Sequence, residues 1–145
     1  MELCDLPAYE IAAKVQRREV SAGEVLESTL QRIAAVDGRP GSLQPGEISA
    51  ADQQQVHAFI TLTAERARLQ AAEVDRKIAA GETAGPLAGV PFTVKDIFCV
   101  QGTPATAASR ILANFVAPYT ATPVQRMEAA GGVMLGKVNL DEFTY

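Results

Sequence analysis

A short apolar segment bounded by glycine and proline most constrains how this chain can fold. Residues 85–96 read Gly-Pro-Leu-Ala-Gly-Val-Pro-Phe-Thr-Val-Lys-Asp. The first residues favour a turn, and the alternation that follows predicts a strand over 90–94. Successive side chains of a strand point to opposite faces, so one face is expected to be apolar and the other to carry Thr93 and Lys95. The strand therefore brings one ammonium group to its carboxyl end.

A second strand is predicted at residues 133–137, after a helix that begins near Thr122. Thr122 is expected to cap this helix, with Pro123 as its first residue, and the glycine pair at 131–132 ends it. A strand, a helix and a strand in this order predict a parallel pair with a right-handed crossover. Sites in such sheets form at the carboxyl ends of the strands, which is where Lys95 lies.

The first third of the chain is predicted to be helical. One helix is expected soon after Asp5, and a second begins at Ser21, where Ser-Ala-Gly-Glu has the pattern of a capping box. Residues 38–55 are rich in Gly, Pro, Ser and Gln, which is typical of a surface loop. The sequence thus divides into a helical segment, 1–37, and a loop, 38–55.

Residues 56–145 are predicted to form the start of an α/β core. A strand over 56–62 and a helix over 64–80, ended by Gly81, precede the parallel pair. The fold class is therefore α/β, with helices packed on a mixed, partly parallel sheet. His57 is the single histidine and is expected on the less buried face of the first strand. A triad built on histidine, or a metal site with several histidines, is not expected.

Composition indicates a globular chain with one modest core. The 145 residues are 48% hydrophobic and 21% charged, which is too apolar for a disordered chain. A net charge of −4 argues against autonomous binding to nucleic acid, because phosphate contacts need clustered lysine and arginine. The N-terminus lacks a basic region followed by an apolar one, and no run approaches membrane-spanning length. The sequence predicts a cytoplasmic protein without membrane contact.

The two cysteines give no sign of a redox or metal site. Cys4 and Cys99 are far apart and form no Cys-x-x-Cys pair, so reduced, buried thiols are expected. Cys99 follows Lys95 by four residues, which invites comparison with the Cys-Glu-Lys nitrilases. Its apolar neighbours favour packing instead, and no suitably placed glutamate motif accompanies it.

Residues 131–137 match the pattern G-x-x-x-x-G-K of a phosphate-binding loop. Val138 occupies the position where Ser or Thr would hold magnesium, and the segment leads from a helix into a strand rather than the reverse. Nucleotide binding is therefore not expected here. Replacement of Lys137 is expected to be mild compared with replacement of Lys95.

Four ordered segments together resemble the amidase-signature family: residues 85–96, 102–109, 114–123 and 131–143. Within that family they are most similar to the A subunits of tRNA-dependent amidotransferases, which act on Glu-tRNA(Gln) or Asp-tRNA(Asn). Asn-Phe-Val-Ala-Pro-Tyr in the third segment and Gly-Lys-Val-Asn-Leu-Asp-Glu-Phe in the fourth favour this group over a generic amidase. The resemblance continues more loosely over residues 5–82.

The resemblance implies a Ser-cis-Ser-Lys triad in which Lys95 is the catalytic lysine. Both family serines follow the Asp-Glu-Phe motif, here residues 141–143, and so lie beyond Tyr145. The chain is therefore expected to be the N-terminal portion, 1–145, of a single amidase domain, with an incomplete sheet and no activity of its own. None of the serines that precede the motif is expected to be the nucleophile: Ser21, Ser28, Ser42, Ser49 and Ser109.

The implied parent enzyme hydrolyses glutamine and releases ammonia, which converts Glu-tRNA(Gln) to Gln-tRNA(Gln). Lys95 would accept a proton from the bridging serine, which only a neutral amine can do, and the apolar strand is expected to favour that form. No cofactor or metal is expected in this chain. ATP and Mg²⁺ are used by the assembled complex, a heterotrimer whose other subunits hold most of the tRNA.

Two alternatives remain open at this point. The first is another amidase-signature hydrolase that acts on free amides without partner subunits. The second is a noncatalytic scaffold that keeps the fold and lacks the serines. The sequence also leaves open whether glutamine or asparagine donates the ammonia, and which of the two mischarged tRNAs is served.

Overall fold

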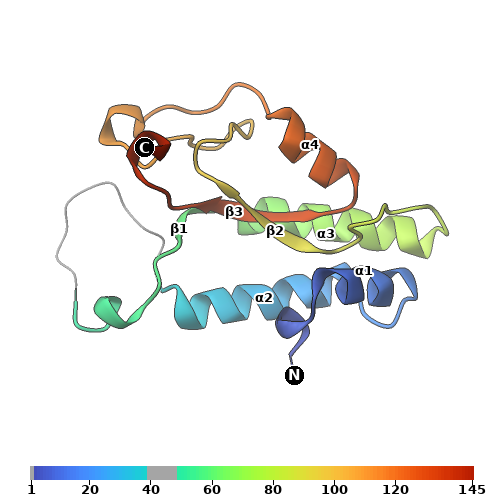
Figure 1. The fold of residues 1–145 in the computed structure, drawn as a ribbon. Coiled ribbons are helices and arrows are strands. Elements are labelled where there is room, and N and C mark those ends of the chain that lie inside the picture. Colours follow the sequence, from blue (N-terminus) through green and yellow to red (C-terminus); the bar gives the residue numbers. More distant parts are fainter. Residues whose placement is uncertain (1, 39–48) are drawn as a thin grey trace.

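The computed structural model describes residues 2–38 and 49–145. In these residues, helices lie on both sides of a small central sheet (Figure 1). Most of the predicted 38–55 loop, together with Ser42, lies outside the described residues. The described end of that loop carries a short 3-10 turn, Asp52–Gln54.

The N-terminal third forms two helices, α1 (Ala8–Gln16) and α2 (Ala22–Val36). The predicted capping box at the start of α2 is confirmed. The Glu24 N–H donates to the Ser21 hydroxyl at 3.0 Å, and the Ser21 N–H donates to the Glu24 carboxylate at 2.8 Å. These two bonds satisfy backbone donors that a helix start leaves without partners. Pro7 lies just before α1, as its N-cap residue.

Three strands form the sheet: β1 (Phe59–Leu62), β2 (Pro91–Lys95) and β3 (Val133–Val138). Their order is β1-β3-β2, so β3 lies in the middle. β2 runs parallel to β3, as predicted, and β1 runs antiparallel to it. The sheet is therefore mixed, and the carboxyl ends of β2 and β3 meet at one edge.

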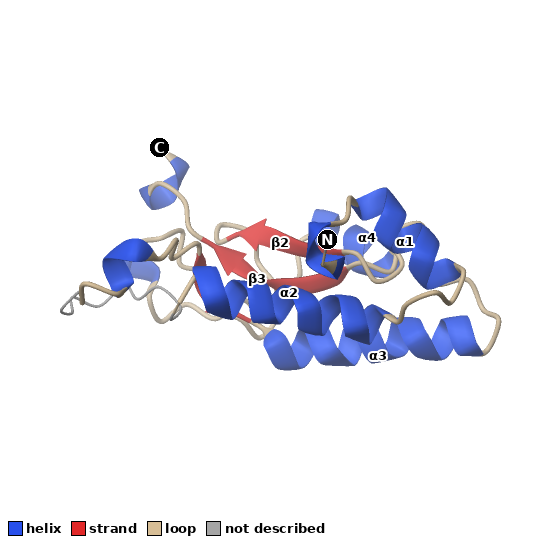
Figure 2. Cartoon of the chain, turned by 90° about the horizontal axis from the view of Figure 1, so that it is seen from below, coloured by secondary structure: helices blue, strands red, loops and turns tan. Residues whose placement is uncertain are grey.

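Two further helices complete the layers, α3 (Ala64–Ala79) and α4 (Thr122–Ala129). The larger apolar cluster joins α1, α2 and α3 to one side of the sheet, where Leu135 is buried. A smaller cluster packs α4 against the other side through Phe92 and Met134 (Figures 1 and 2). The sheet thus has a face covered by three helices and a face covered by α4.

The turn before β2 packs closely against the end of α4. The Leu87 N–H donates to the Ala130 carbonyl at 2.8 Å, and the Gly89 N–H donates to the Gly131 carbonyl at 3.0 Å. Gly85 has a φ of +94°, and a side chain there would collide with the Ala130 backbone. Glycine is therefore required for the approach that sets β2 beside β3.

The predicted cap of α4 is wrong by one residue. Thr122 is the first residue of the helix, and the N-cap is Ala121, whose carbonyl accepts the Gln125 N–H at 3.1 Å. A threonine caps a helix with its side-chain oxygen only from the position before the first turn. Such one-residue differences are usual at helix ends.

The first strand is shorter than predicted, because it begins at Phe59 rather than Val56. His57 is not in the strand: it has a φ of +53°, and its Nε2 lies 2.8 Å from the Asp52 carbonyl oxygen. The strand starts where the buried Asp37 carboxylate accepts the Phe59 N–H at 3.2 Å. A contact distant in sequence thus overrides the local alternation.

Candidate active site

Lys95 ends β2 on the exposed side of the strand. Phe92 and Val94 are buried while Thr93 and Lys95 are exposed, as the alternation predicted. In the part of the chain that the structure describes, no hydrogen bond or ion pair involves the Lys95 ammonium group. Within these residues the apolar side chains of β2 do not shield the amine, because they lie on the opposite face and leave it open to water.

A β-bulge turns Lys137 to the other face of the sheet. Phe92 pairs with Met134, but Thr93 pairs with Gly136, so β3 carries one extra residue at Leu135. Strict alternation would place Lys137 on the same face as Leu135. The extra residue reverses the alternation, so Lys137 lies beside its partner Val94, on the side of α4. The lysines at the ends of β2 and β3 therefore project to opposite faces.

Lys137 is fully buried in an ion pair with Asp96, the residue after Lys95. Its Nζ lies 2.9 Å from Asp96 Oδ1, and both side chains are 0% exposed. The same Nζ donates to the Pro104 carbonyl at 2.9 Å. Asp96 Oδ2 accepts the Thr106 N–H at 2.9 Å and a short hydrogen bond from the Thr106 hydroxyl. The sequence did not predict this cluster, although a lysine in an otherwise apolar strand was its signal.

The ion pair also holds the loop that follows β2. Residues 103–109 are mostly buried, and Ala107 and Ala108 both have positive φ, +50° and +54°. Non-glycine residues adopt this conformation at a cost, so the surroundings must enforce it. The Ala107 N–H donates to the Asp96 carbonyl at 3.3 Å, and the Ala107 carbonyl accepts the Phe143 N–H at 2.9 Å. Asp96 thus fixes both the strand end and this loop.

The buried position of Lys137 gives it a structural role that the sequence did not predict. The lysine of the G-x-x-x-x-G-K pattern is enclosed by Asp96 and Pro104 and cannot reach a bound phosphate. Its removal would leave the Asp96 carboxylate buried without its counter-ion, which is costly. The segment is thus part of the architecture and does not fit a nucleotide site.

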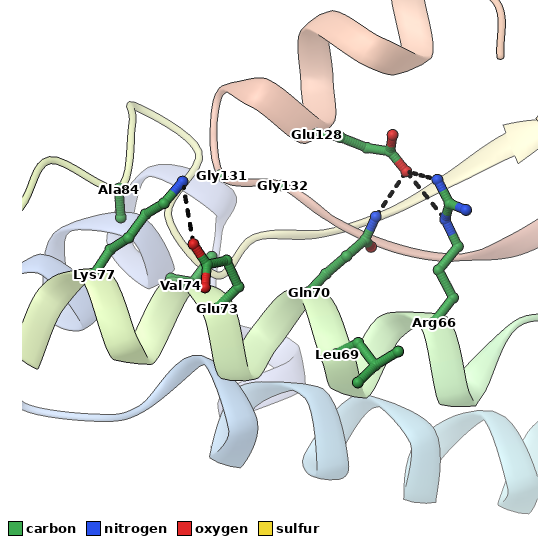
Figure 3. A pocket seen from close by; sticks show the side chains of 10 residues that line it. All are labelled: Arg66, Leu69, Gln70, Glu73, Val74, Lys77, Ala84, Glu128, Gly131 and Gly132. Atoms are coloured by element: carbon green, nitrogen blue, oxygen red, sulfur yellow. Dashed lines mark hydrogen bonds and ion pairs between the residues drawn. The ribbon is translucent and has the colours of Figure 1, made fainter.

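A groove of about 310 Å³ lies between α3 and α4, away from Lys95 (Figure 3). Glu128 projects from α4 and accepts hydrogen bonds from Arg66 at 2.7 Å and from Gln70 at 2.7 Å. Gln70 in turn accepts the Met134 N–H at 2.8 Å. The groove borders the amino end of β3, the opposite end from the two lysines. Its polar groups serve to join α3 and α4 to the sheet.

Comparison with known proteins identifies the family. The family model described as Amidase matches residues 47–145. This chain belongs to the amidase-signature family. The A subunit of the glutamyl-tRNA(Gln) amidotransferase of Moorella thermoacetica is 46% identical over 99% of this chain and 26% of its own length. That of Salinispora arenicola is 48% identical over 98% of this chain and 26% of its own. The chain spans about a quarter of the length of the curated relatives it matches.

Solved structures support the same assignment for the amidase fold. The native peptide amidase of Stenotrophomonas maltophilia matches with a TM-score of 0.78 and 31% identity, over 96% of this chain and 26% of that one. An enzyme of s-triazine catabolism, described with a vestigial protein complex and a bound inhibitor, matches with a TM-score of 0.83 and 36% identity. That match covers 97% of this chain and 27% of the other. The α/β class predicted from the sequence is confirmed.

The serines that the structure describes in this amidase-family chain bind backbone N–H groups. Each accepts a backbone N–H: Ser21, Ser28, Ser49 and Ser109. Ser109 is fully buried. In the described residues, no hydrogen bond joins any of these hydroxyls to Lys95.

The cysteines are less buried than predicted. Cys4 and Cys99 are both free and half-buried rather than enclosed. A hydrogen bond to the Cys99 side chain raises the pKa of the Tyr119 hydroxyl above its ordinary value.

Among the described residues, no group of three or more His, Cys, Asp or Glu side chains is placed to hold a metal ion. The described helices are also too short or too polar to cross a membrane.

Proposed function

We propose that this chain is the N-terminal portion of the glutamine-hydrolysing A subunit of a tRNA-dependent amidotransferase, with Lys95 as a catalytic residue. The observation that carries the proposal is the Lys95 side chain: an amine without a partner in the described residues, at the carboxyl end of a parallel strand. Relatives that are 46% and 48% identical over nearly the whole chain carry the name of this subunit.

In the proposed reaction Lys95 is the final proton acceptor. The neutral amine takes a proton from the bridging serine, which takes one from the second serine, and this second oxygen attacks the amide carbon of glutamine. The C–N bond breaks, ammonia leaves with the returned proton, and water hydrolyses the acyl-enzyme to glutamate. Both serines belong to sequence beyond residue 145. That sequence would cover the open face of β2 and exclude water from Lys95, which favours the neutral amine.

The proposal assigns no cofactor to this chain. ATP and Mg²⁺ act in the assembled complex, where the partner subunits of a heterotrimer use the ammonia and bind most of the tRNA. The net charge of −4 agrees with a minor part in tRNA binding. The complex would work in protein biosynthesis in the cytoplasm.

The experiment measures ammonia release from glutamine by the complete protein together with its partner subunits. We expect Lys95→Ala to lower kcat by about 10²- to 10⁴-fold, the usual effect of removing a proton acceptor. Lys77→Ala is the matched control, because it removes a lysine whose only ion pair in the described residues is with Glu73 on the surface of α3, at 3.8 Å. Near-wild-type activity of Lys95→Ala would refute the proposal. Parallel assays with asparagine and with both mischarged tRNAs identify the amide donor and the acceptor.

A second candidate is an amidase that acts on free amides without partners. The likeness to the peptide amidase of Stenotrophomonas maltophilia favours it. Both candidates use Lys95 in the same way, so its mutation does not separate them. Activity measured with and without the partner subunits does, because only the amidotransferase depends on them.

A further inference from the structure

The buried ion pair lies directly behind the proposed proton acceptor. Asp96 follows Lys95 in sequence, and every polar atom of its side chain has a partner. Oδ1 receives the Lys137 ammonium at 2.9 Å, and Oδ2 receives the Thr106 N–H at 2.9 Å together with the Thr106 hydroxyl. The carboxylate therefore has little freedom to rotate.

The backbone at Lys95 and directly after it is held as well. The Asp96 N–H donates to the Val138 carbonyl at 3.0 Å, and the Asp96 carbonyl accepts the Ala107 N–H at 3.3 Å. The Lys95 carbonyl accepts the Phe98 N–H at 3.0 Å. The main chain at Lys95 is thus fixed while its side chain, exposed and without a polar partner in the described residues, remains free to reach a reacting group.

We infer that the Lys137–Asp96 ion pair positions Lys95 for proton transfer, an inference that rests on the proposed function. A buried ion pair adds little stability compared with well-packed apolar residues, so its use here is best explained by geometry. The bulge at Leu135 supports this role, because it is what turns Lys137 toward Asp96. Lys137 and Asp96 are positioning residues, since neither side chain is open to a substrate.

The test uses Asp96→Asn/Lys137→Met in the complete enzyme with its partner subunits. The double variant removes both charges together, so neither is left buried alone, and methionine approximates the length of lysine. We expect kcat for glutamine hydrolysis to fall roughly 10- to 100-fold, because displacement of a reacting group by about 1 Å has effects of this size. KM should stay within about twofold, because the pair makes no contact with substrate.

The matched control is Arg66→Met/Glu128→Gln, which removes the 2.7 Å ion pair between α3 and α4. This pair is partly buried and borders the amino end of β3, so kcat should not change. If the Asp96/Lys137 double variant kept wild-type kcat, the pair would be structural only and the inference would be overturned. If the double variant kept wild-type kcat while Lys95→Ala was inactive, only the inference would fail and the proposed function would stand. An active Lys95→Ala enzyme would overturn both the inference and the proposed function.

A further variant covers failure of the double variant to fold. Thr106→Val keeps the ion pair and removes only the hydroxyl that anchors the 103–109 loop to Asp96. We expect a several-fold loss in kcat, on the order of what one such hydrogen bond contributes, at unchanged KM. An unchanged kcat in this variant would also overturn the inference.

Discussion

The two lysines at the carboxyl ends of β2 and β3 lie on neighbouring strands, but their surroundings are opposite. Lys95 pairs in register with Val138, and Lys137 with Val94. Lys95 is exposed and has no polar partner in the described residues, whereas Lys137 is enclosed and bonded to Asp96 and a carbonyl. The face of the sheet on which each lysine lies therefore decides its surroundings. We assign the chemistry to the exposed lysine, and to the buried one the framework that positions it.

The largest expected effect on stability separates the two lysines. Lys137→Ala should lower the free energy of unfolding by about 3–5 kcal/mol, because it leaves the Asp96 carboxylate buried without its counter-ion. Lys95→Ala should change it by less than about 0.5 kcal/mol, as an exposed substitution does. Urea unfolding of the complete protein, followed by circular dichroism, measures both. An equal loss in the free energy of unfolding for both variants would contradict the different roles of the two lysines.

The next effect compares a buried threonine of the 103–109 loop with an exposed one of β2. Thr106→Val removes a hydroxyl that donates to a buried carboxylate, and should cost about 2 kcal/mol. Thr93→Val, on the exposed face beside Lys95, should cost less than about 0.5 kcal/mol. The same unfolding experiment compares them. A larger loss in the free energy of unfolding for Thr93→Val than for Thr106→Val would contradict this contrast.

A smaller effect is expected far from both lysines. Ser21→Ala removes the hydroxyl that caps α2 and should cost about 1 kcal/mol in the free energy of unfolding. Amidase activity should not change, because α2 carries none of the proposed reacting groups. A fall in kcat with Ser21→Ala would show that the helical layer contributes to the site, which would sharpen the contrast between framework and chemistry.

The smallest effect is a dependence of that capping on pH. The Ser21 N–H lowers the pKa of Glu24 below its ordinary value of 4.5. A carboxylate with a lowered folded-state pKa adds stability above its unfolded pKa and loses it as the pH falls through the folded value. The stability difference between wild type and Glu24→Gln should therefore shrink as the pH is lowered from 7 to 3. A difference that stayed constant over this range would contradict the role of the charge.

Features that depend on local pattern could be predicted from the sequence alone. The two N-terminal helices, the capping box at Ser21 and the position of Lys95 opposite the apolar row follow from patterns over a few residues. The parallel pairing of β2 and β3 follows from the order strand, helix, strand. The first three require only neighbours along the chain and the pairing only the order of the elements, which is why the sequence predicted them.

The position of Lys137 and its partners depend on tertiary contacts. Alternation along β3 would place Lys137 with Leu135, and the bulge that reverses this depends on register with a strand about 40 residues earlier. Gly136 permits the bulge, because a side chain there would collide with the backbone of Thr61 in β1. The partner of Lys137 is thus set by contacts across the whole sheet. Such contacts leave no periodic signal along the chain, so the sequence alone could not predict them.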